Sequence, residues 1–110
     1  MKHIKLVANL MDPDTDHQSK DLAVSHLFEG ESRKVVAVRL QNNAVLARHH
    51  ADIPITVQCI SGKGVFAAGA KLDEFQELRP GVLLTLEAGV EHEVVADPDV
   101  YVLVTKFTHK

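Results

Sequence analysis

Histidine is the residue type in this chain whose number and spacing are suited to chemistry. The 110 residues include seven histidines, and three of them, His49, His50 and His92, lie beside turn-forming residues at the ends of apolar runs. Neutral imidazole is the commonest side-chain ligand of transition metals, and such sites gather ligands from several strands. The three histidines are therefore candidate ligands of one divalent transition metal. Zinc, iron, nickel and manganese are not distinguished by them, and a chain without metal remains an alternative.

Two other residues that could take part in chemistry have plainer interpretations. His26 lies between Ser25 and Leu27 in an apolar run, and we expect it to be a packed or surface side chain rather than a ligand. Cys59 is the single cysteine, which excludes an intrachain disulfide and a multi-cysteine zinc site. It lies well inside a predicted strand, so we expect a small core hydrophobe.

The elements that must position the histidines are short strands. Turn-forming residues recur at about strand length, and the runs between them are rich in valine, leucine, isoleucine and threonine, which pack well on pleated sheets. The sequence therefore predicts an all-β fold of two antiparallel sheets. The expected strands are Leu22–Phe28, Lys34–Leu40, Ile53–Ile60, Lys71–Leu78, Val82–Leu86, His92–Ala96 and Val100–Phe107.

Length and charge restrict the class of protein. A chain of 110 residues is expected to form one domain, with N-terminal edge strands and a polar loop (Met11–Lys20) over 1–33 and the barrel over 34–108. The net charge of −3 argues against a nucleic-acid partner. No apolar run approaches a membrane span, and the first twenty residues lack the apolar core of a signal peptide. We therefore expect a cytoplasmic protein without a membrane partner.

The last predicted strand is apolar on both faces. Val100, Val102 and Val104 alternate with Tyr101 and other largely apolar residues. A monomer would expose too much of this surface, so we expect a homodimer.

The stretch 81–92 resembles the second motif of the cupins: glycine, five residues, Pro-x-Gly, two residues, histidine. Gly81, Gly89 and His92 match in register, while Glu87 stands at the proline position. The stretch 49–62 is similar to a degraded first motif, in which His49 takes the first histidine position.

The resemblance implies a double-stranded β-helix (RmlC-like, jelly-roll) barrel that is usually homodimeric. Many cupins hold a catalytic metal with three histidines and one glutamate. Here only His49 and His92 fall on ligand positions, because Ala51 stands at the second histidine position and Ile55 at the glutamate position. His50 is one residue out of the strand alternation, so its membership is conditional on a bulge at the strand end.

Charged residues near the histidines are secondary candidates. Asp52 and Glu91 are nearby carboxylates that could supply an oxygen ligand, although neither stands on the family's position. Arg39 and Arg48 could meet an anionic ligand near the barrel, and surface charge is the plainer interpretation of both.

Ile55 makes the expected pocket more apolar. If Ile55 points inward, Val57 and Cys59 follow by the two-residue period, and the three form a pocket floor below the histidines. Three functions remain open. The first is a cupin that binds a metal, a small molecule or both through its histidines. The alternative is a metal-free small-molecule-binding or sensory cupin without catalysis. The third is a structural or interaction protein whose barrel is filled by side chains. The sequence leaves open whether the protein is an enzyme.

Overall fold

The predicted all-β architecture is confirmed by the computed structural model, which describes residues 3–11, 17–18 and 21–108. These residues contain antiparallel strands and no helix, and every strand is joined to the others through backbone hydrogen bonds. The strands are β1 (His17–Gln18), β2 (Leu22–Glu29), β3 (Arg33–Leu40), β4 (Val45–His49), β5 (Ile55–Ala68), β6 (Glu74–Leu78), β7 (Leu83–Leu86) and β8 (His92–Phe107).

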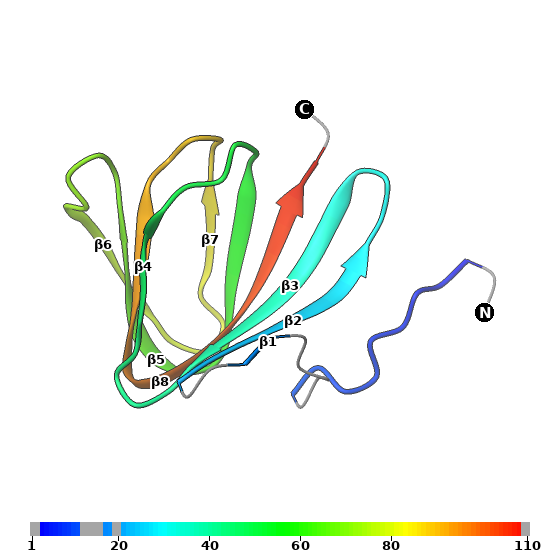
Figure 1. Cartoon of the computed structure of the whole chain (residues 1–110), viewed down its shortest axis with the longest axis horizontal. Coiled ribbons are helices and arrows are strands. Elements are labelled where there is room, and N and C mark those ends of the chain that lie inside the picture. Colours follow the sequence, from blue (N-terminus) through cyan, green and yellow to red (C-terminus); the bar gives the residue numbers. More distant parts are fainter. Residues whose placement is uncertain (1–2, 12–16, 19–20, 109–110) are drawn as a thin grey trace.

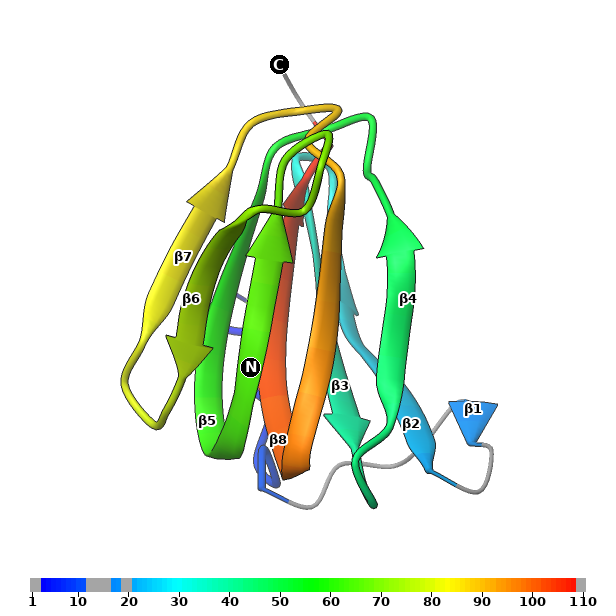
Figure 2. The same cartoon turned by 90° about the vertical axis from the view of Figure 1, so that its left-hand side faces the viewer.

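Two long strands, β5 and β8, take part in both layers of the structure. In one layer, the first half of β5 pairs with the second half of β8. β7 pairs with this half of β5 and β3 with this half of β8, and β2 extends the layer beyond β3. In the other layer, the second half of β5 pairs with β6, and the first half of β8 pairs with β4. Both long strands turn at the lower end of Figure 1, and their ends lie at the upper end. The side view in Figure 2 shows β4 and β7 on opposite sides of the molecule.

The turn residues in the middle of these strands bend them instead of ending them. The sequence pattern predicts that strands end at Ile60, before Ser61–Gly64, and at Ala96, before Asp97–Asp99, and this prediction is wrong. The pairing of β5 with β8 shifts register on both sides of Gly62. Gly62 has a φ of 80°, and a Cβ there would collide with the carbonyl oxygen of Asp99. Glycine thus lets two bent strands approach closely.

The shorter strands occur where the sequence pattern predicts strands, but their bounds differ from those predicted. The expected strand Lys71–Leu78 is a strand only from Glu74, because Leu72 lies in a turn with a φ of 51°. Within the expected polar loop Met11–Lys20, His17 and Gln18 pair with β2. Residues 12–16 and 19–20 of that segment lie outside the described residues.

The interior lies between the layers and is filled by alternate residues of β3, β5 and β8. Leu40, Leu78, Val100 and Cys59 are almost completely buried. Part of the outer face of β8 is covered too. Tyr101 is buried there, and its hydroxyl donates a hydrogen bond to the carbonyl oxygen of Leu10. Leu10 of the N-terminal segment therefore contributes to this cover.

Candidate binding cavity

A cavity of about 500 Å³ lies between the two layers. Most of its wall is aliphatic, with Val36 and Val38 from β3 and Val102 and Val104 from β8 as examples. Its ionisable lining residues are His26, His49, His50, Asp52, His92 and Lys106. The cavity therefore combines a large apolar wall with a small set of polar groups, as small-molecule sites commonly do.

His49 and His92 meet in this cavity, as the motif register predicts. They are register partners on β4 and β8, and β4 has an irregular register between Leu46 and His49. The ring centroids lie 4.2 Å apart with an interplanar angle of 63°. His92 is buried at 4% exposure, whereas His49 is exposed. One imidazole thus lies within the wall and the other faces solvent.

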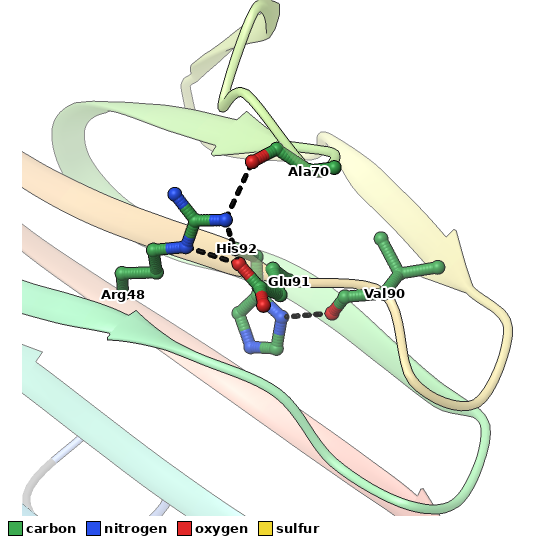
Figure 3. Close-up of polar contacts among 5 residues, drawn as sticks. All are labelled: Arg48, Ala70, Val90, Glu91 and His92. Atoms are coloured by element: carbon green, nitrogen blue, oxygen red, sulfur yellow. Dashed lines mark hydrogen bonds and ion pairs between the residues drawn. The ribbon is translucent and has the colours of Figure 1, made fainter.

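In both imidazoles the same ring nitrogen is occupied by a backbone carbonyl. Nδ1 of His49 lies 2.8 Å from the carbonyl oxygen of Ala47, and Nδ1 of His92 lies 3.0 Å from that of Val90 (Figure 3). A carbonyl oxygen only accepts, so Nδ1 donates in each case. In the neutral rings this leaves each Nε2 with a lone pair for a ligand or a metal ion.

The surroundings of His92 favour its neutral form. Burial lowers the pKa of this imidazole, and the neighbouring ionisable groups of His49, His50 and Lys106 lower it further, although the carbonyl of Val90 acts in the opposite direction. The ring of Phe66 stacks on His92 with centroids 5.4 Å apart and an interplanar angle of 11°. Packing and charge therefore act together to hold a neutral acceptor in the wall.

Arg48 links the two histidine-bearing segments through contacts outside the cavity lining. Its guanidinium pairs with the carboxylate of Glu91 and also donates to the carbonyl oxygen of Ala70 (Figure 3). Arg48 and Glu91 each precede one histidine of the pair, so the strand alternation directs them away from the cavity. Glu91, a candidate oxygen ligand by sequence, is engaged by this contact.

The family's metal-ligand set is incomplete here. His50 lines the cavity, but its Nε2 lies 3.4 Å from Oδ1 of Asp52. Among the described residues, no three His, Cys, Asp or Glu side chains form a group that could hold a metal ion. Catalytic metal sites commonly use three protein ligands. The two facing imidazoles alone therefore leave a metal site at least one protein ligand short of the usual catalytic set.

The expected pocket floor is present in part. Ile55 and Val57, at 4% and 2% exposure, line the cavity. Cys59 does not: it lies beyond the lining in the core, and its Sγ is 3.5 Å from the carbonyl oxygen of Ser61. Burial raises the pKa of its thiol, which disfavours the nucleophilic thiolate.

Among the polar and aromatic lining residues, His26, Phe66 and Lys106 are not predicted as site residues from the sequence. His26 is paired in register with Val36, and Lys106 follows Val102 and Val104 at the two-residue period. That period is the available signal for Lys106. The pairing of β2 with β3, which brings His26 to the cavity, is a tertiary contact that the local pattern does not contain.

Comparison with known proteins identifies the fold. No family model and no curated protein sequence matches the chain. Solved structures do match. An RmlC-like cupin from Desulfovibrio desulfuricans is 23% identical, with 96% of this chain and 97% of that chain covered and a TM-score of 0.79. The polyketide cyclase RemF from Streptomyces resistomycificus is 15% identical, with 96% and 80% covered and a TM-score of 0.80.

An RmlC-like cupin from Shewanella frigidimarina is 12% identical, with 91% of this chain and 87% of that chain covered and a TM-score of 0.78. The chain therefore has the cupin fold, a double-stranded β-helix, and the resemblance seen in the motifs extends to the whole architecture. None of the described residues forms a helix that could span a membrane.

Proposed function

We propose that the protein binds a small, largely apolar organic molecule in the cavity between its two layers. The observation that supports this most is the cavity itself, about 500 Å³ in volume and mostly aliphatic in its wall. The Nε2 atoms of His49 and His92 accept a hydrogen bond from a hydroxyl or N–H group where the molecule carries one, and a carboxylate of the molecule would need a different partner. Binding of this kind requires no catalytic step.

The test uses 1-octanol as a neutral apolar probe. A ligand that binds only the folded state raises the midpoint of thermal unfolding, so 1-octanol should raise it for the wild type. Val104→Phe adds an aromatic ring to the cavity wall and should remove that rise. The matched control is Leu103→Phe, at the adjacent residue on the opposite face of β8, which should keep it. No rise in the wild type, or equal rises in both variants, contradicts the proposal.

A second candidate function is the binding of a divalent transition metal (zinc, iron, nickel or manganese) by His49 and His92. The specific observation in its favour is the 4.2 Å separation of the two rings, with both Nδ1 atoms occupied by carbonyl oxygens. Such backbone contacts orient metal-binding imidazoles through Nε2. The remaining coordination positions would be filled by water or by an oxygen of the small molecule.

The metal candidate is tested by elemental analysis of protein purified without a histidine tag or chelator, followed by titration with Ni²⁺. We expect His49→Asn to lose Ni²⁺ binding and His3→Asn, outside the cavity, to retain it. Equal binding by wild type and His49→Asn contradicts this site.

The expected homodimer and cytoplasmic location stay predictions. In support of a dimer, Ile4 and Leu6 of the N-terminal segment are 61% and 69% exposed, and Phe75 of β6 is 70% exposed. Exposed apolar side chains of this size are candidates for burial against a second copy of the chain. Sedimentation equilibrium at micromolar concentration tests this, and a species of 12.1 kDa would contradict it.

A further inference from the structure

Two lysines stand directly opposite each other at one end of the apolar wall. On β3 and β8 the register pairs are Val38 with Val102, Val36 with Val104, and then Lys34 with Lys106. The four valines line the cavity. Alternate residues of a strand share a face, so both lysines continue this row, and Lys106 itself is a lining residue.

Two like charges opposite each other on one face of a sheet are destabilising. Lys34 has a partner, because its Nζ lies 3.7 Å from the Glu29 carboxylate. Lys106 forms no ion pair with any carboxylate of the described residues. It is half-buried, and its other register partner is the buried Ile55. The described part of the chain thus gives Lys106, a residue of the apolar cavity wall, no counter-ion, and an anionic ligand can supply one.

The other charged groups of the cavity do not supply that counter-ion. Asp52 is the one carboxylate among the described residues that line the cavity, and it lies beside His50. Arg48 and Arg39, the sequence candidates for meeting an anionic ligand, are engaged elsewhere. Arg48 pairs with Glu91, and Arg39 lies over the Tyr101 ring on the outer face. Among the lysines and arginines in the described part of the chain, Lys106 is the one that lines the cavity. It is therefore the residue that can pair with an anionic ligand there.

We propose that the ligand of this cavity is an amphiphilic organic anion, a monocarboxylate with an apolar body. Lys106 binds the carboxylate, and the apolar body lies along the valines of β3 and β8. This inference rests on the proposed function, because it requires that the cavity accept an apolar molecule. It adds the charge of the ligand and the residue that recognises it.

The experiment compares octanoate with 1-octanol, which has the same chain length and no charge, by isothermal titration calorimetry. A charge-assisted hydrogen bond should make octanoate bind about tenfold more tightly to the wild type. Lys106→Met keeps most of the length of the side chain. The affinities of this variant for octanoate and 1-octanol should differ by no more than about twofold. Lys106→Arg keeps the charge and should retain the preference. Lys63→Met removes an exposed lysine that pairs with Asp97, and it should behave as the wild type does.

The outcomes separate this inference from the proposed function. Equal binding of octanoate and 1-octanol to the wild type overturns the anion inference and leaves the apolar cavity standing. Absence of binding by both probes overturns both. A preference for octanoate that persists in Lys106→Met overturns the assignment to Lys106. The wild-type comparison does not depend on any variant, so the inference stays falsifiable even if Lys106→Met does not fold.

Discussion

His49 and His92 are register partners on β4 and β8, and their rings meet edge to face with centroids 4.2 Å apart. Because each Nδ1 is held by a carbonyl two residues earlier in the chain, backbone and ring orientation are coupled at both positions. The pair is therefore a rigid acceptor unit, and its properties depend on the packing of His92 and on the contacts that hold β4 against β8.

The protonation of His92 should make the stability of the protein depend on pH. The pKa of His92 in the folded protein lies below the value of 6.5 expected in the unfolded chain. Between these two values the unfolded chain binds a proton that the folded protein does not. The free energy of unfolding should therefore fall as the pH falls through this interval, and the loss should be complete below the folded pKa. His92→Asn keeps an amide donor for Val90 and removes this contribution.

The measurement is urea unfolding of wild type and His92→Asn over a series of pH values. The difference between the two should change with pH below about 6.5 and be constant above it. His3→Asn, at an exposed residue outside the barrel, should parallel the wild type throughout. A constant difference between wild type and His92→Asn at all pH values would show that burial of His92 does not govern its protonation.

Arg48 is predicted to act as a positioning residue for the histidine pair. Arg48→Gln removes the contacts with Glu91 and Ala70 that tie β4 to the start of β8. Because the ion pair is partly exposed, the free energy of unfolding should fall by only about 1 kcal/mol. The pKa of His92, followed by NMR, should rise toward its usual value as water reaches the loosened pair.

The control for Arg48 is Arg79→Gln, which removes an exposed ion pair with Glu77. This variant should leave the pKa of His92 unchanged. An unchanged pKa in Arg48→Gln, or the same rise in both variants, would contradict a positioning role for Arg48.

Phe66 separates two spaces, and its removal should join them. It lines both the central cavity and a groove of about 380 Å³ between β6 and β7, and only 3% of it is exposed. Phe66→Ala should lower the free energy of unfolding by about 3 to 5 kcal/mol and admit 1-dodecanol more readily than the wild type does. Phe66→Leu keeps most of the wall and should lower the free energy of unfolding by less. Similar losses from both variants would mean that the ring is not a tightly packed partition.

Individual residues show which parts of the fold and the site can be predicted from the sequence. The two-residue period predicts the strands, and the resemblance of residues 81–92 and 49–62 to the two cupin motifs implies the meeting of His92 with His49. They do not predict that Gly62 bends a strand, because the close approach of Asp99 is a tertiary contact. They also miss Lys106, since a lysine after an apolar run is usually solvated and its neighbours come from β3 and β5.

The position of Lys106 changes the expected behaviour of Ile55→Glu. From the sequence alone, a glutamate at this position would be a buried carboxylate without an assured cation, or a fourth ligand for a metal. In the structure Ile55 and Lys106 are register partners on β5 and β8. Side chains at such positions are about 5 Å apart at Cβ, so the new carboxylate can pair with the lysine.

Ile55→Glu should therefore act as an internal anion. It should abolish the preference for octanoate over 1-octanol, because the ammonium of Lys106 is already paired. The matched control, Ile55→Gln, introduces a polar group of the same shape without charge and should keep the preference. Combining Ile55→Glu with Lys106→Met leaves the carboxylate unpaired, which should cost about 3 to 5 kcal/mol more than the sum of the single variants predicts. Additive losses of stability in this double-mutant cycle would mean that the introduced carboxylate and Lys106 do not interact, and would place the charge of Lys106 outside the cavity.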